Sequence, residues 1–349
     1  MRAAALLLAV TSALVLSSCG GKIADDLGAA VVLPGTLPDS GPGSSTEDPR
    51  RCGPRALDCE GGMCIGGRCT PVVLAGNVDP NLIAQDADRV YVTDAKRGAI
   101  YAVPKDGGKL ETLATLEFPS SGIAVGDGLV FFASSRAVHS VPVHGGADTV
   151  VAPVPTNANA LALRGSSIYV LDSQAFGSVS AIDRATGTIR KISITASLPR
   201  AVTADGDRAY WSESFGEFFA EGGKADPTAL GQDHSLSNVA AIVADDTNLY
   251  FTDASDRGRV GKIAKSGGPI ATVQSLAYAG GLALTGDDLF VGQLGGPDGT
   301  GGALVKISKR TGEVTPLAEK LGRPTYLVDD GRRLFFVDVT RRTINKLVR

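Results

Sequence analysis

A short run of strand-forming residues returns seven times along this chain of 349 residues. Each copy begins with an apolar residue and continues with Tyr or Phe and a second large apolar residue, as in Leu249-Tyr250-Phe251-Thr252-Asp253. Successive copies start 40, 38, 41, 40, 40 and 45 residues apart. A fixed period of this length, rich in residues that favour strands, is typical of a β-propeller with one blade per repeat. The first residues of the seven copies, called anchors below, are Val90, Val130, Ile168, Ala209, Leu249, Leu289 and Leu334.

The segment before each anchor predicts the innermost strand of a blade. The residue seven positions before the anchor is always branched and apolar, whereas the residues six and eight positions before it are mostly small. Such alternation places bulky side chains on one face of a strand and small ones on the other. We therefore expect the bulky face to pack between blades and the small face to line a narrow channel. Tyr326 and Asp329 are the main polar groups expected near the channel axis.

The two ends of the repeat region each lack what the other supplies. Val72–Gly76 resembles a fourth strand without its first three, and Thr343–Val348 a third strand without a fourth. Pairing these segments would close the ring and leave no free sheet edge. The sequence therefore predicts an all-β protein in which residues 71–349 form a seven-bladed β-propeller closed by its N-terminal strand.

Residues 1–18 have the pattern of an export signal, with an apolar run too short to cross a membrane comfortably. Leu16-Ser17-Ser18-Cys19 resembles the lipobox of bacterial lipoproteins, which implies that acylated Cys19 anchors the mature protein in a membrane. Gly20 after this cysteine favours the outer membrane or the cell surface. An ordinary secretory signal with an incidental cysteine is the alternative. Residues 19–51, rich in Gly, Pro and Ser, predict a disordered tether.

Residues 52–70 hold the other four cysteines, with the spacing C-x6-C-x4-C-x4-C. Behind an export signal, this pattern predicts a small module with two disulfides, although the spacing leaves their connectivity open. Resemblance to small EGF-like modules implies the interlaced order Cys52–Cys64 and Cys59–Cys69. A zinc site is the alternative, but the segment has no C-x2-C pair and no nearby histidine.

Several repeats resemble a known motif. Val90-Tyr91-Val92-Thr93-Asp94, Ala209-Tyr210-Trp211-Ser212-Glu213 and the copy at Leu249 are similar to YWTD repeats of the low-density-lipoprotein-receptor type. The order of lipobox, cysteine-rich module and YWTD-like blades also resembles a group of bacterial surface lipoproteins. In YWTD propellers the motif aspartate ties neighbouring blades together. The resemblance implies this structural role for Asp94, Asp172, Asp253 and Asp338.

The sequence contains no recognisable catalytic constellation. Its three histidines fall in different predicted blades, and a Gly-x-Ser-x-Gly elbow is absent. The glycine-rich run at residues 295–302 lacks the Lys-Ser/Thr of a P-loop. We therefore expect no catalytic residue, no bound metal and no cofactor. The formal net charge of −3 argues against a nucleic-acid partner, and a monomer is expected.

One predicted surface is modestly cationic. In a propeller, the loops from second to third strands and from fourth to first strands share one face, called the loop face below. Arginine suits carboxylate, phosphate or sulfate partners because its planar fork makes paired hydrogen bonds. The arginines predicted to ring the channel on this face and to bind a ligand are Arg97, Arg136, Arg257 and Arg341.

Two classes of function remain. The first is a lipid-anchored, extracytoplasmic binding or scaffolding protein for a protein, a peptide or an envelope glycan. The alternative is a metal-dependent hydrolase of the lactonase or SMP-30 type, which holds a divalent cation in its channel. That chemistry needs Glu, Asp and Asn side chains that converge on the axis. The predicted channel positions carry Ala, Gly, Thr and Val instead, so binding is preferred by elimination.

Overall fold

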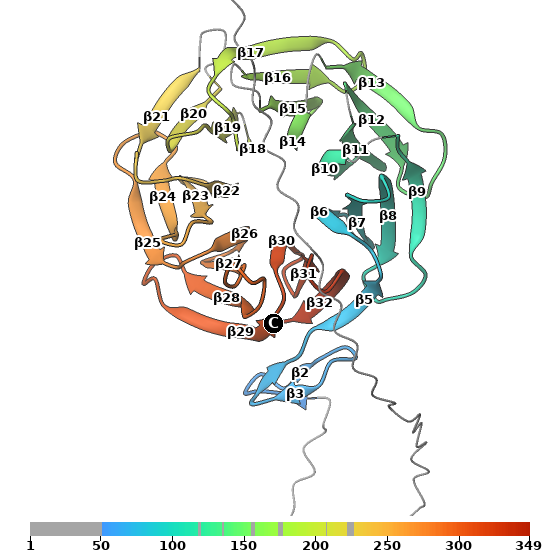
Figure 1. Cartoon of the computed structure of the whole chain (residues 1–349), viewed down its shortest axis with the longest axis vertical. Helices are drawn as coiled ribbons and strands as arrows, with labels where there is room; N and C mark the ends of the chain where they lie inside the picture. The colour runs from blue at the N-terminus through green and yellow to red at the C-terminus, as the bar shows by residue number, and fades with distance from the viewer. Residues whose placement is uncertain are drawn as a thin grey trace, which may run out of the picture. The chain divides into compact units, whose positions relative to one another are not determined.

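The computed structural model describes residues 51–117, 120–134, 136–154, 158–173, 177–206, 208–221 and 227–349. Seven four-stranded antiparallel sheets form a ring around a central channel (Figure 1). The described residues contain no helix, and so none that could span a membrane. The predicted all-β, seven-bladed propeller is confirmed. The predicted signal peptide, Cys19 and residues 20–50 of the predicted tether lie outside the described residues, whereas Arg51, the last residue assigned to the tether, belongs to a strand.

The innermost strand of each blade lines the channel, as the alternation predicted. Adjacent inner strands approach closely, which explains the small residues there: a Cβ atom on Gly122 would lie 2.8 Å from Leu161 Cγ in the next blade. Blades are numbered from the one that begins with β6. In blade order, the inner strands are β6 (Pro80–Gln85), β10 (Ser120–Gly126), β14 (Ala158–Arg164), β18 (Ala201–Asp205), β22 (Val239–Ala244), β26 (Ala279–Thr285) and β30 (Pro324–Asp329).

The second strand of each blade contains the anchor and its aromatic neighbour, and it forms the centre of the core. The anchors are buried, and Phe251 of blade five packs against Phe218 of blade four with ring centroids 4.7 Å apart. Aromatic burial therefore joins neighbouring sheets face to face. The second strands are β7 (Arg89–Asp94), β11 (Leu129–Ser134), β15 (Ser167–Asp172), β19 (Arg208–Ser212), β23 (Asn248–Asp253), β27 (Asp288–Gln293) and β31 (Arg333–Asp338).

The third and fourth strands complete each blade towards the outside of the ring. The third strands are β8 (Ala99–Pro104), β12 (Ala137–Pro142), β16 (Gly177–Asp183), β20 (Glu217–Ala220), β24 (Arg259–Ala264), β28 (Gly302–Ser308) and β32 (Thr343–Val348). The fourth strands are β9 (Glu111–Thr115), β13 (Thr149–Pro153), β17 (Ile189–Ala196), β21 (Thr228–Gln232), β25 (Ala271–Ser275), β29 (Val314–Leu321) and β5 (Val72–Gly76). Blade seven is completed from the N-terminal side, because β5 pairs with β32 and places Gly76 opposite Thr343. This pairing confirms the predicted closure of the ring.

Cations in the turns after the third strands link neighbouring blades. Lys309 of blade six donates to Asp245 of blade five at 2.8 Å, and its ammonium lies 5.4 Å from the centroid of the Tyr250 ring. Burial acts to raise the pKa of Asp245, but hydrogen bonds from Lys309 and from two backbone amides lower that pKa overall. Three other junctions combine a cation, an acid and an aromatic ring in this way: Lys105 with Asp330 and Phe335, Arg184 with Asp127 and Phe131, and Lys265 with Asp205 and Tyr210.

The cysteine-rich segment forms two small hairpins and packs against blades six and seven. The hairpins pair β1 (Arg51–Cys52) with β2 (Leu57–Asp58), and β3 (Cys64–Ile65) with β4 (Arg68–Cys69). The disulfides join Cys52 to Cys64 and Cys59 to Cys69, the order that the EGF-like resemblance implied. Three of these cysteines are buried in one core cluster with Leu304, Leu321 and Leu347 of the propeller. The module and the propeller therefore share a hydrophobic core.

Candidate functional site

The motif acids fix the loops of the loop face. Asp94 accepts hydrogen bonds from the amides of Lys96 and Arg97 in its own loop, and from the amide of Asp79 in the loop that enters blade one. Asp253 and Asp338 make equivalent bonds to both kinds of loop. These contacts give Asp94, Asp253 and Asp338 the structural role that the YWTD resemblance implied. These bonds tie the backbone of the loops to buried strands.

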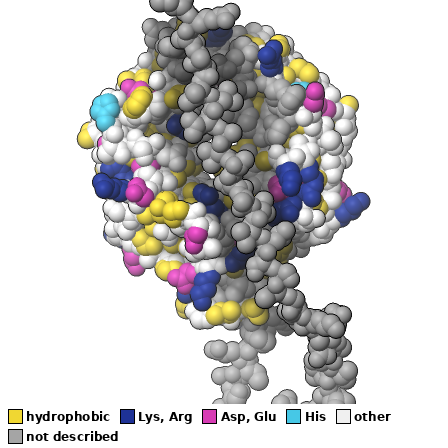
Figure 2. All heavy atoms as spheres, in the orientation of Figure 1, with side chains coloured by type: hydrophobic (Ala, Val, Ile, Leu, Met, Phe, Trp, Pro, Cys, Tyr) yellow, Lys and Arg dark blue, Asp and Glu magenta, His cyan; other side chains and the backbone are white. Residues whose placement is uncertain are grey.

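The four predicted rim arginines differ in their surroundings. Arg97 pairs with Asp94 at 3.1 Å and also donates to the Asn77 carbonyl, and the Arg341 side chain lies 3.7 Å from Asp338. Arg136 and Arg257 are exposed, and their side chains have no partner within the described ranges. On the part of the surface visible in Figure 2, basic side chains are interspersed with acidic ones. Charge alone therefore marks no single binding patch there.

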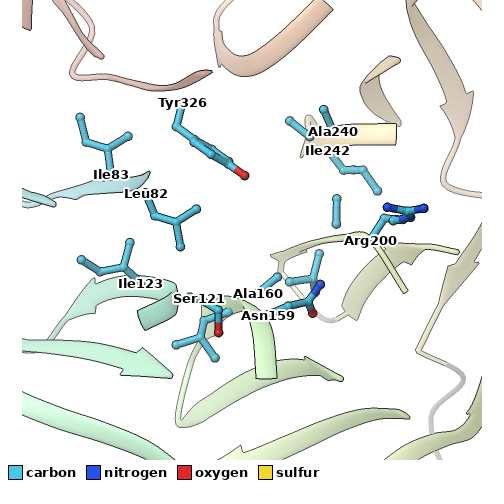
Figure 3. Close-up of a pocket in the computed structure, with 15 residues that line it drawn as sticks. Leu82, Ile83, Ser121, Ile123, Asn159, Ala160, Arg200, Ala240, Ile242 and Tyr326 are labelled. Atoms are coloured by element: carbon cyan, nitrogen blue, oxygen red, sulfur yellow. The ribbon is translucent and has the colours of Figure 1, made fainter. Parts of the chain in front are cut away.

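A cavity of about 190 Å³ opens into the channel and is lined by inner strands of several blades (Figure 3). Its apolar walls include Leu82, Ile123 and Ile242, together with several alanines. None of the four predicted rim arginines belongs to its lining, and the described lining contains no carboxylate. The cavity is therefore an apolar pocket with a few polar groups, which is the usual character of a binding site.

Four polar side chains line this cavity: Ser121, Asn159, Arg200 and Tyr326. Arg200 is exposed and its guanidinium has no partner in the described part of the chain, while Asn159 Oδ1 is buried and likewise unpaired. Figure 3 shows Arg200 and Asn159 on the same side of the cavity and the Tyr326 hydroxyl pointing into its centre. Burial raises the pKa of Tyr326, so its hydroxyl stays protonated at neutral pH. The site can donate to an anion and can also accept a hydrogen bond.

The expected small channel lining needs correction in two respects. Bulky Ile123 and Ile242, which were expected to pack between blades, also line the cavity. Polar side chains line it as well, at the positions that precede the inner strands' regular pairing. Ser121 and Asn159 stand nine residues before their anchors, where the pairing register shifts between Ser120 and Gly122 and between Ala158 and Ala160. Such bulges leave a residue unpaired and can redirect its side chain. Period-two alternation does not reveal a bulge, so the sequence identified Tyr326 but missed Ser121 and Asn159. Asp329, the second predicted axial group, is only 2% exposed and pairs with Arg349 at 2.6 Å.

The described residues contain one close cluster of potential metal ligands, Cys52, Cys59 and Cys69. All three cysteines are oxidised in disulfides, so their sulfurs are not free thiolates. This cluster is therefore explained by the disulfide module and defines no zinc site.

Comparison with known proteins identifies the fold. No protein-family model and no curated protein matches the sequence. The WD40 propeller domain of Doa1 matches with a TM-score of 0.65 and 11% identity, covering 79% of this chain and 95% of that one. U3-55K matches with a TM-score of 0.66 and 10% identity, covering 80% and 98%. At such identities the likeness shows that this chain is a seven-bladed β-propeller.

One similar structure comes from a bacterial surface. PorZ, described as an essential surface component of the type-IX secretion system of Porphyromonas gingivalis, matches with a TM-score of 0.58 and 16% identity. The match covers 80% of this chain but 38% of PorZ, so this chain corresponds to a part of that protein. This likeness, too, is one of fold.

Proposed function

We propose that the protein is a lipid-anchored, extracytoplasmic propeller that binds a protein or peptide partner on its loop face. The observation that carries the proposal is the channel cavity, in which the unpaired Arg200 guanidinium accompanies the unpaired Asn159 carbonyl oxygen and the Tyr326 hydroxyl. Polar groups left unpaired beside apolar walls favour a partner that supplies the missing hydrogen bonds. Arg136 and Arg257 provide further exposed cations on the same face.

A protein or peptide fits the cavity better than an envelope glycan. Sugar rings bind well on exposed aromatic faces, whereas the single tryptophan, Trp211, is fully buried and Tyr326 is the one aromatic residue of the described cavity lining. The lipobox-like motif and the disulfides support a place outside the cytoplasm. PorZ, a propeller of similar fold, is itself a bacterial surface component.

Two experiments test the proposal. The lipid anchor is tested by expressing the Cys19→Ser variant in a host that processes lipoproteins. The variant should lack acyl labelling and be absent from the membrane fraction, whereas the wild-type protein should be acylated and found in that fraction. For binding, the full chain in detergent is screened against peptide and glycan arrays, with metal analysis of the same sample. The control variant has Arg136, Arg200 and Arg257 all changed to Gln. Peptide binding by the wild type that this variant loses would support the proposal. Selective glycan binding, or a stoichiometric divalent cation with lactone hydrolysis, would replace it.

A further inference from the structure

Blade four combines an unpaired arginine and an exposed aromatic side chain on two adjoining loops. Arg200 precedes β18, and Phe215 lies in the turn between β19 and β20, where its side chain is 64% exposed at a φ of 70°. The Ser214 amide donates to the Ser197 carbonyl at 3.0 Å, and the Arg200 amide donates to the Ser212 carbonyl at 2.9 Å. A bulky residue in the left-handed region is unusual and is often found at functional sites. Aromatic residues and arginines are also the commonest hot spots of protein interfaces.

No other large apolar side chain in the described loops of this face is exposed. The remaining exposed ones lie in the cysteine-rich module or on outer strands of the blades. Phe215 is therefore the exposed apolar side chain that the described loop face offers to a partner. It belongs to the same blade as Arg200.

The size of the cavity limits what can enter it. Pockets that bury a whole small-molecule ligand usually measure about 300–1,000 Å³, whereas this cavity measures about 190 Å³. Leu82, Ile123 and Ile242 form apolar walls, and Arg200 supplies the positive charge. The matching group is one apolar residue that carries its own negative charge.

The distribution of charge along the channel favours an anion at the loop face. The turns from first to second strands lie at the opposite end, and there three acids, Asp88, Asp246 and Asp287, and one cation, Arg208, are exposed without a side-chain partner in the described residues. Since strand one is innermost, these turns stand near the axis. Arg200 is also the one charged side chain of the described cavity lining, so a negative group is attracted to the cavity.

We propose that the cavity binds the C-terminal residue of a peptide or protein, an assignment that rests on the proposed function. The terminal carboxylate pairs with the Arg200 guanidinium, whose fork matches its two oxygens. The last peptide N–H donates to Asn159 Oδ1, and the terminal side chain lies against Leu82, Ile123 and Ile242. Phe215 packs on a residue further upstream. An internal Asp or Glu would bring two flanking peptide segments into the small cavity, whereas a chain end brings only one.

The test uses two matched libraries of random six-residue peptides, one ending in a free carboxylate and the other in a carboxamide. Binding to the full chain in detergent is measured by fluorescence anisotropy. We expect binders with an apolar last residue, and we expect amidation of a selected peptide to weaken its binding about 10- to 100-fold. Arg200→Gln should weaken the free acid by a similar factor and leave the amide unchanged, because it removes the same charge pair.

Two further variants separate the site from general effects. Arg310→Gln removes an exposed arginine from the opposite side of the ring and should leave both peptides unaffected. Ala240→Leu fills the cavity without removing charge and should abolish binding of the free acid while the thermal melt stays unchanged. Selected peptides that bind equally as acid and amide, with no effect of Arg200→Gln, would overturn the chain-end assignment but leave peptide binding in place. No binder in either library would overturn both.

Discussion

Glu60 of the cysteine-rich module should be a major stabilising residue, because it neutralises a buried lysine of the propeller. Lys346 in β32 has a side chain that is only 4% exposed, and its ammonium lies 3.3 Å from Glu60 Oε2. Within the described residues Lys346 has no other ionic partner. Glu60 also contacts Arg332 at 2.7 Å and Arg333 at 3.5 Å. Arg333 keeps Asp330 and Asp106 as partners when Glu60 is neutralised.

Glu60→Gln retains the shape of the side chain and removes its charge, so it leaves the Lys346 ammonium buried without a counter-charge. Removing one partner of a fully buried pair costs about 3–5 kcal/mol. Since the Glu60 side chain is 17% exposed and water can approach it, we expect a loss of about 2–3 kcal/mol in the free energy of unfolding. Adding Lys346→Met removes the stranded charge and should restore more than half of this loss.

The assay is urea denaturation with the disulfides intact. The fluorescence of Trp211, which is buried in blade four away from the module, reports unfolding of the ring. Glu319→Gln is the matched control, because Glu319 is an exposed acid on β29 without a side-chain partner in the described structure. The reasoning fails if Glu60→Gln unfolds within about 0.5 kcal/mol of wild type, the usual range of surface changes, or if Lys346→Met adds to the loss.

Three further predictions concern the propeller itself. Lys309→Met removes the cation that joins Asp245 and Tyr250 of the preceding blade, and urea titration should show a loss of about 1–2 kcal/mol that Arg310→Gln does not cause. Gly261→Ala should cost about 1–3 kcal/mol through overpacking, because the added Cβ would overlap the Phe251 ring, and an unchanged thermal melt would contradict this packing. Hydrogen bonds from Ser235, together with Arg259, lower the pKa of Asp233 from 3.8 to about 2 despite partial burial. The stability that Asp233 provides is therefore complete above pH 3.8 and is lost as the pH falls towards 2, so Asp233→Asn should flatten the pH dependence of unfolding in that interval.

The sequence could predict the ring because its determinants are local and repeated. Each anchor and its aromatic neighbour recur at nearly constant intervals, and each inner strand shows period-two alternation. The missing fourth strand of blade seven and the spare strand at Val72–Gly76 likewise follow from counting strands. The four cysteines indicated two disulfides, but their pairing depended on resemblance until the structure brought the sulfurs together.

The candidate site could be predicted only in part. Arg97 and Arg341 each stand three residues after a motif aspartate, a spacing that allows the acid to hold the arginine in place. Tyr326 was identified from its position on an inner strand, because alternation determines the side of a strand. The sequence places Arg200 in a loop, but the residues next to it in the sequence do not indicate that a cavity lies beside it.

What the sequence determined by itself is the repeat: its strands, the number of blades and the closure of the ring, all of which arise from local pattern and chain order. Tertiary structure decided the rest, because the remaining features depend on residues that are distant in sequence. Bulges place Ser121 and Asn159 in the channel, and only the pairing register of the folded strands reveals these bulges. Glu60 reaches Lys346 across 286 positions of the chain. A contact of that kind leaves no periodic trace, since its partners are brought together only when the ring and the module fold against each other.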